Sequence, residues 1–226
     1  MPVAAGFAES FTASLSKVWN FFVTGGWFMV PLIICSLILV AVVVWKVLDL
    51  KRERIIPESL AARLRDSGPL MAAGKFGTLQ QALLHDNSVL AVICRSALLN
   101  RHPDQAAAAR AAEATGREEV AVMERGISVM EVIFTIAPML GLIGTVSGLV
   151  RIFSNFGEGA KDAAAAQEIA AGIAEAMNTT IAGLAVAVPA LIAQVFFSRK
   201  VERCALRIGS LVNNALDAVW QAPDPR

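Results

Sequence analysis

The chain has 226 residues, of which 56% are hydrophobic and only 17% are charged, and its formal net charge is +1. This composition is too apolar for an ordinary soluble domain and indicates a membrane protein, while the near-zero net charge gives no basis for nucleic-acid binding. The three cysteines have neither the spacing of a disulfide framework nor that of a structural zinc site. We expect no metal and no cofactor.

The first predicted elements are an interfacial helix and a membrane span. A helix at the outer membrane–water interface is predicted over residues 1–24, because apolar side chains fall near one helical face at Phe7, Phe11, Leu15, Trp19 and Phe22. The 28 residues between Lys17 and Lys46 carry no charge and include the run "WFMVPLIICSLILVAVVVW". A run of this length crosses a bilayer as a helix, which predicts the first transmembrane helix over residues 25–48.

Residues 49–126 are predicted to form a cytoplasmic helical segment. Its last part, "QAAAARAAEATGREEVAVMERG", is rich in strong helix formers, with Glu and Arg spread along it. This part runs directly into the second apolar stretch, and Gly126 is its only interruption. We therefore expect one helix to continue from the cytoplasm through the second span.

The second and third spans are predicted over residues 127–153 and 170–198. Between Glu131 and Arg151 lie 19 uncharged residues, and between Glu175 and Arg199 lie 23. A periplasmic connection over 154–169 joins them, and an amphipathic cytoplasmic helix over 199–226 follows, with apolar residues spaced by three or four. The predicted fold is all-α, with three transmembrane helices, two of which extend into a cytoplasmic helical bundle.

The orientation in the membrane follows from the basic residues. The segment from Lys46 to Arg125 carries 12 Lys or Arg, and five more follow the third span. By contrast, the first 26 residues contain only Lys17, and the connection between the last two spans contains only Arg151 and Lys161. The positive-inside rule therefore predicts a periplasmic N-terminus and a cytoplasmic C-terminus.

Glycines and one threonine distinguish the second span. Gly141, Gly144 and Gly148 allow another helix to approach closely, and the last two have GxxxG spacing. Thr145 lies on nearly the same face as Gly141 and Gly148. Its hydroxyl either serves an ion pathway or bonds back to a carbonyl of its own helix, as transmembrane threonines often do.

The third span has two distinct faces. Glu175, Thr179, Ala182, Val186 and Ala193 cluster on one side and are candidates to line a pore. A stripe of small residues, turned away from that side, suits packing on a neighbouring helix; it contains Ala176, Thr180, Gly183, Ala187 and Ala190. Pro189 is predicted to kink the helix.

Glu175 has two readings on the sequence alone. An ionisable residue within a span indicates function by default. The 23-residue gap to Arg199 spans roughly 34 Å of helix, however, slightly more than the hydrocarbon thickness of ~30 Å. Glu175 would then be a boundary residue in contact with interfacial water.

No nucleophile–base arrangement, P-loop or dinucleotide fingerprint occurs, so an enzyme is not expected.

Two long stretches resemble the MotA/TolQ/ExbB proton-channel family, and most closely its ExbB-like members. They are "ERGISVMEVIFTIAPMLGLIGTVSGLVRIF" and "GIAEAMNTTIAGLAVAVPALIAQVFFSR", in the order and at the spacing of the family. The stretch "GGWFMVPLIICSLILVAVVVWKVLDLKR" is also similar to the first span of the family.

The resemblance implies a cation-driven motor in the inner membrane of a double-membraned bacterium. Five copies would form a ring whose pore, lined by the second and third spans, holds the single transmembrane helices of two copies of an ExbD/TolR-like partner. An aspartate of that partner would carry the proton. By position in the motifs, Thr145, Thr180 and Glu175 match the family's two threonines and its glutamate. The helical wheel, however, places Thr179 rather than Thr180 on the face of Glu175, so both threonines are candidates to face the pore.

The predicted function is that of a proton-channel subunit that drives a periplasmic partner, for outer-membrane uptake through a TonB-like protein. The alternative within the family is a TolQ-like role or a gliding or flagellar-type stator. A different class of protein, a non-conducting membrane scaffold, would use the glycines and threonines for packing alone.

Overall fold

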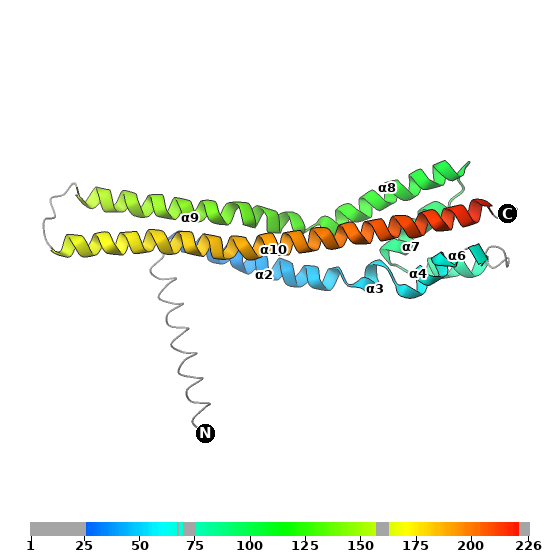
Figure 1. The fold of residues 1–226 in the computed structure, drawn as a ribbon, viewed down its shortest axis with the longest axis horizontal. Helices are drawn as coiled ribbons and strands as arrows, with labels where there is room; N and C mark the ends of the chain where they lie inside the picture. The colour runs from blue at the N-terminus through cyan, green and yellow to red at the C-terminus, as the bar shows by residue number, and fades with distance from the viewer. Residues whose placement is uncertain (1–25, 67, 70–75, 157–162, 222–226) are drawn as a thin grey trace, which may run out of the picture. The chain divides into compact units, whose positions relative to one another are not determined.

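The computed structural model describes residues 26–66, 68–69, 76–156 and 163–221, and the elements within them are helical (Figure 1). The predicted N-terminal helix over 1–24 and residues 157–162 of the predicted connection lie outside the described residues. The helices are α2 (Met29–Asp49), α3 (Arg52–Ile55), α4 (Glu58–Arg65), α6 (Phe76–His85), α7 (Val89–Leu98), α8 (Gln105–Glu124), α9 (Ile127–Phe156) and α10 (Ala163–Gln221). The prediction of an all-α protein is confirmed.

Three of these helices are long and apolar enough to cross a membrane. They are α2, the Ile127–Ser154 part of α9 and the Ile169–Gln221 part of α10. Each contains a stretch of the length that a bilayer core requires, and most of the side chains in these stretches are not buried within the chain. Apolar side chains without a protein neighbour are stable in lipid, so the chain is a membrane protein.

The expectation of one helix from the middle segment through the second span is wrong. Helix α8 ends at Glu124 and α9 begins at Ile127. Arg125 between them has an extended backbone (φ −55°, ψ 135°), and Gly126 has φ 84°. A positive φ of this size is accessible to glycine at little cost, so Gly126 changes the chain direction here. Of the two helices expected to extend a span, only α10 continues unbroken.

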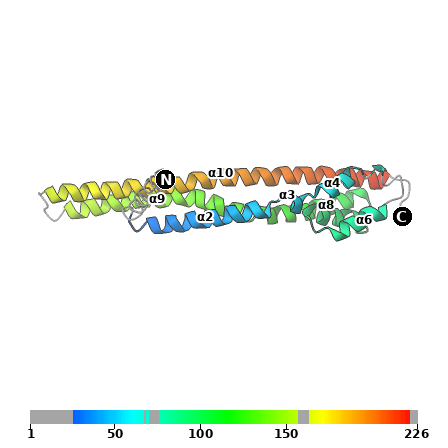
Figure 2. The same cartoon turned by 90° about the horizontal axis from the view of Figure 1, so that it is seen from below.

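The chain divides into two compact units, and the first combines Met1–Val42 with Val129–Gln194. In this unit α9 and α10 run antiparallel and side by side, with the start of α2 beside them (Figures 1 and 2). A small apolar cluster joins the three helices, and Phe134, Leu140 and Val186 pack against it; its buried members are Met29, Leu32, Ala137, Ala182 and Ala187. The many alanines in this cluster keep the helices close together.

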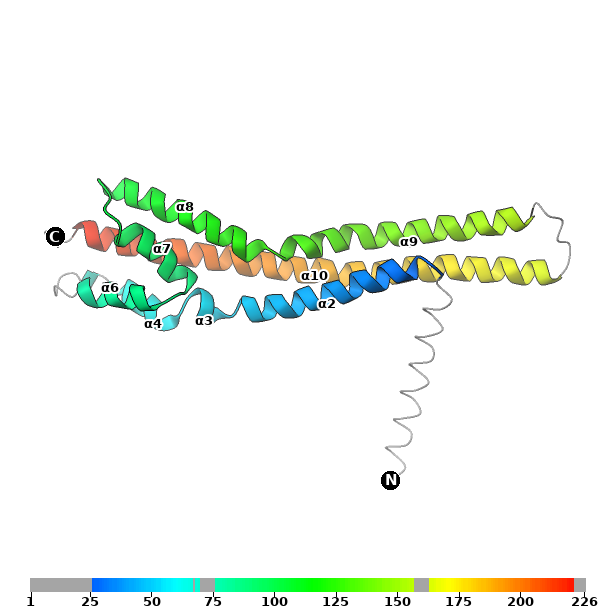
Figure 3. The ribbon, with the colours of Figure 1, turned by 180° about the vertical axis from the view of Figure 1, so that it is seen from behind.

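The second unit combines Val43–Ser128 with Val195–Arg226. Helix α7 contacts α8, α6 and α3, and Figure 3 shows it lying beside α8. Side-chain caps begin two of these helices, since Ser88 accepts from the Ala91 amide at 3.3 Å and Asp104 accepts from the Ala107 amide at 2.6 Å. The α10 part of the unit supplies a buried apolar stripe with helical spacing, made of Val201, Ile208, Leu211, Val212, Ala215 and Leu216.

Cys94 of α7 lies in the core of the second unit with no exposed surface. Burial raises the pKa of its thiol to about 12, because the charged thiolate would lose its hydration there. The thiol is therefore protonated at neutral pH and packs as a small apolar group.

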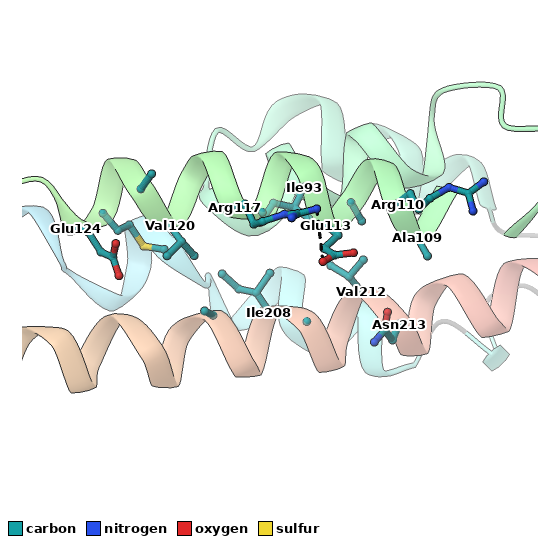
Figure 4. A pocket seen from close by; sticks show the side chains of 16 residues that line it. Ile93, Ala109, Arg110, Glu113, Arg117, Val120, Glu124, Ile208, Val212 and Asn213 are labelled. Atoms are coloured by element: carbon teal, nitrogen blue, oxygen red, sulfur yellow. Dashed lines mark ion pairs between the residues drawn. The ribbon is translucent and has the colours of Figure 1, made fainter. Parts of the chain in front are cut away.

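A groove of about 560 Å³ lies between α8 and α10 in the second unit (Figure 4). Ile208 and Val212 of α10 point across it toward α8, and the Glu113–Arg117 ion pair of α8 lies at its edge with a 3.5 Å separation. Gly116 and Gly209 also line the groove, and a Cβ added to Gly209 would have no neighbour within 4 Å. The groove is open partly because these two glycines have no side chains.

Candidate functional site

Helices α9 and α10 approach each other closely at the glycines of the second span. A Cβ added to Gly141 would lie 3.1 Å from the Thr180 Cα, and one added to Gly144 would lie 2.5 Å from the Thr179 Cγ2. At Gly148 the nearest atom would be the Ala176 Cβ, also at 3.1 Å. All three glycines are buried and face α10, and a larger residue at these positions would force the helices apart.

Helix α10 contributes glycines of its own to this contact. A Cβ added to Gly183 would lie 2.6 Å from the Ala137 carbonyl oxygen, and one added to Gly172 would lie 2.6 Å from the Ile152 Cγ1. Pro189 lies within α10, exposed and with helical backbone on both sides, and the predicted kink there stays a prediction.

Two glycines of α10 should respond in opposite ways to alanine substitution. Gly183→Ala places a methyl group against a backbone oxygen, and such overpacking typically costs about 1–3 kcal/mol. Gly209→Ala adds a methyl group in open space and removes backbone freedom from the unfolded chain, which should stabilise the protein by about 0.5–1 kcal/mol. Thermal melting of the two purified variants beside the wild type measures both. An equal response of the two variants would contradict the close contact at Gly183.

The two adjacent threonines of α10 both face α9. Thr179 is 1% exposed, and its hydroxyl donates to the Glu175 carbonyl oxygen at 2.6 Å. Thr180 is half-buried, and its hydroxyl donates to the Gly141 carbonyl oxygen of α9 at 3.2 Å. Thr180 therefore joins the two helices by a hydrogen bond, while Thr179 fills the space that Gly144 leaves open.

The two faces predicted for the third span are not separated as expected. Thr179 and Ala182 from the candidate pore face are buried, and so are Ala176 and Ala187 from the small-residue stripe. The centres of the two faces are only about 100° apart on a helical wheel, so one neighbouring helix covers part of each. In the single chain, both faces take part in packing.

Thr145 bonds within its own helix. Its hydroxyl donates to the Leu142 carbonyl oxygen at 2.6 Å, and the side chain is half-buried. This local hydrogen bond is the alternative that the sequence left open for Thr145. A hydroxyl held in this way still has its oxygen lone pairs available to accept a further hydrogen bond.

Glu175 makes an ion pair that the sequence did not predict. The Arg151 Nη2 of α9 donates to the Glu175 Oε2 of α10, 24 positions further along the chain. The side chains are 57% and 19% exposed, respectively. On the other side, a Cβ added to Gly26 would overlap the Glu175 Oε1, and Gly26 has φ 69°. Only glycine fits this position without strain.

One feature of the sequence indicates that Arg151 and Glu175 pair. Arg151 is the only charged residue in α9 after Glu131, and Glu175 is the only one in α10 between residues 169 and 198. Two isolated opposite charges at the facing ends of adjacent antiparallel spans are expected to meet. Helical spacing relates only residues of the same helix, so it does not predict a contact between Arg151 of one span and Glu175 of another.

Comparison with known proteins places these helices in a family. The model of the MotA/TolQ/ExbB proton channel family matches residues 83–209. The chain is 33% identical over 188 residues to the biopolymer transport protein ExbB-like 1 of Synechocystis sp., covering 80% of this chain and 71% of the relative. It is 32% identical to ExbB-like 3 of the same organism over 188 residues, covering 80% and 86%.

A TolQ protein also matches the chain. The Tol-Pal system protein TolQ of Haemophilus influenzae is 32% identical over 104 residues, which cover 46% of this chain and 45% of the relative. The family match includes all of α9 and most of α10, where the close glycine contacts, the threonine hydrogen bonds and the Arg151–Glu175 pair lie. The chain therefore belongs to the MotA/TolQ/ExbB proton channel family, as an ExbB-like membrane protein.

Proposed function

We propose that the chain is the proton-channel subunit of an ExbB–ExbD-type motor, which uses the proton-motive force to drive a periplasmic partner. The observation that carries the proposal is the placement of hydroxyl groups and one carboxyl group along the α9–α10 pair of a protein in a proton channel family. An ionisable group such as Glu175 is costly within a membrane span and indicates function by default, and the hydroxyl groups lie on the same helix pair.

The proposed ion pathway consists of Thr145, Thr180, Glu175 and Thr179. A threonine hydroxyl both donates and accepts hydrogen bonds but holds no extra proton at accessible pH. It can therefore stabilise water beside a carboxylate that gains and loses a proton. The proton carrier itself would be an aspartate in the single span of an ExbD/TolR-like partner, which would be costly to bury in its ionised form without such hydroxyls.

The proposed assembly is a ring of five copies around two partner helices, in the bacterial inner membrane. Glu175 keeps part of its surface exposed, and Thr145 is only half-buried in the single chain. Polar groups in spans almost always face a bundle interior or a water-filled cavity, and a closed ring provides one. The N-terminus would be periplasmic, and the second unit would form a cytoplasmic helical bundle.

Native mass measurement tests this assembly. When the chain is co-expressed with an ExbD/TolR-like single-span protein and extracted in mild detergent, we expect a complex of five copies with two of the partner. A stable monomer, or a ring that binds no single-span partner, would contradict the proposal. It would favour the non-conducting scaffold instead.

Substitutions of Glu175 test the pathway itself. We expect Glu175→Ala to lower proton uptake to roughly a tenth or less, the factor that about 1.4 kcal/mol of lost stabilisation gives, and Glu175→Gln to lower it partly. The physical reason is that hydration of the outer entrance depends on the carboxylate. The measurement is acidification of the interior of right-side-out membrane vesicles that contain the chain and its partner. Glu202→Ala, which removes the carboxylate of an exposed ion pair with Arg199, is the control. Normal uptake with Glu175→Ala would make Glu175 a boundary residue.

The driven process is proposed to be TonB-dependent outer-membrane transport. The TolQ relative favours a second candidate, a TolQ-like role in the cell envelope. Deletion of the gene separates the two. Loss of uptake of large substrates through the outer membrane supports the first candidate, whereas envelope defects with normal uptake support the second.

A further inference from the structure

The Arg151–Glu175 pair has a feature that the proposed proton pathway does not explain. Both oxygens of the Glu175 carboxylate already have close neighbours. The Arg151 guanidinium binds Oε2, and the Gly26 backbone lies against Oε1. The Arg151 side chain is the more exposed of the two, and the Glu175 side chain is mostly buried.

The surrounding packing holds the two helices close together beside the pair. Next to it, a Cβ added to Gly148 would lie 3.2 Å from the Gly172 carbonyl oxygen, and one added to Gly172 would meet Ile152. The two helix backbones therefore touch one turn away from the ion pair on each helix, which keeps the backbones of Arg151 and Glu175 close together. Gly26, whose carbonyl oxygen accepts from the Met29 amide at 3.1 Å, closes the site from the start of α2.

The chemistry of the pair distinguishes a proton from a metal cation. A lone carboxylate facing water attracts cations, and rings of carboxylates select them in channels. The guanidinium group is positively charged at every accessible pH, so it does not leave the carboxylate through loss of a proton. A metal cation needs an open oxygen ligand beside it, whereas a proton moves along hydrogen-bonded water and hydroxyl groups and needs none.

We propose that Arg151 is a selectivity residue, whose guanidinium occupies the cation position beside Glu175 and thereby excludes monovalent metal cations from the outer entrance. This proposal rests on the proposed function, because an entrance requires an ion pathway. It adds a role for a residue that acts through Glu175 and carries no proton itself.

Sodium binding to the purified full-length chain in lipid nanodiscs tests the proposal. Arg151→Gln leaves the carboxylate without its partner, and we expect its Tm to rise by roughly 3 °C when sodium chloride replaces choline chloride, as for a single site of modest affinity. The wild type and Arg151→Lys should show no such rise. The double variant Arg151→Gln/Glu175→Gln should lose the response, because the sodium ligand is gone.

Two further variants keep the test decisive. Glu175→Asp shortens the carboxylate, so that it no longer reaches the guanidinium, and should gain a sodium response with Arg151 unchanged. Arg199→Gln, which removes the same charge from an exposed pair with Glu202, should gain none. The proposal is overturned if the wild type responds to sodium, or if neither Arg151→Gln nor Glu175→Asp does. The sodium experiment involves no partner and no proton gradient. A negative result would therefore not contradict the proposed proton motor, which the native mass and proton-uptake experiments test.

Discussion

Replacing Thr145 and Thr180 together by valine is expected to abolish energy coupling while the protein still folds and assembles. Valine keeps the shape of threonine but removes the hydroxyl, which in the structure is held by the Leu142 carbonyl in one case and the Gly141 carbonyl in the other. The loss of such a hydrogen bond within a membrane costs about 1 kcal/mol or less. Proton transfer, by contrast, should slow by at least roughly 100-fold, the scale on which a positioned proton-transfer group acts.

The measurement is the driven process in cells whose native gene is replaced by the variant, together with native mass of the complex. Thr135→Val is the matched control, because Thr135 lies in α9 and donates to the Glu131 carbonyl at 3.0 Å, as Thr145 does to Leu142. The control should keep full coupling. Full coupling in the double valine variant would show that the hydroxyl groups take no part in proton transfer and would support a non-conducting membrane scaffold.

A second large effect is expected at Asp49, which pairs with a completely buried lysine. The Lys46 side chain is 0% exposed, and its Nζ lies 3.1 Å from the Asp49 Oδ2 and 4.9 Å from the centre of the Trp45 ring. Asp49→Ala leaves the lysine charge buried without its carboxylate. Breaking a buried pair in this way typically costs 3–5 kcal/mol, and since Asp49 is 32% exposed we expect about 3 kcal/mol.

Thermal melting should show this loss as a fall in Tm of roughly 6–12 °C. Glu113→Ala breaks an exposed pair with Arg117 and should change stability by less than about 0.5 kcal/mol. The double variant Lys46→Met/Asp49→Ala replaces the whole pair by apolar groups and should recover most of the loss. If Asp49→Ala melted like the wild type, the lysine would have to reach water in the folded protein.

The membrane class of the protein could be predicted because it depends on local composition. A run of about 20 apolar residues is stable across a bilayer whatever the rest of the chain does, since its backbone hydrogen bonds close within the helix. The three runs are the helices α2, α9 and α10. The quoted motifs around Gly141 and Thr180 likewise indicated the family, which the matched residues 83–209 then showed.

The break at Gly126 illustrates where local reasoning stops. Glycine within a helix costs only about 1 kcal/mol relative to alanine, so the sequence pattern is compatible both with a continuous helix and with two helices. The direction in which α8 packs decides between them. In the second unit α8 packs on α7, and the positive φ of Gly126 permits the change of direction.

The helical class and the three spans follow from hydrophobic length and periodicity, which act over neighbouring residues, and the family follows from the motifs. The side-chain contacts depend on the folded arrangement: Arg151 meets Glu175, Thr180 meets Gly141, and Lys46 meets Asp49 in a fully buried position. The first two pairs join different helices, and their contact depends on how closely the glycines let α9 and α10 approach. The third pair is local, but the complete burial of Lys46 depends on how its helix packs. Burial and contacts between helices are properties of packing, which no single helix encodes.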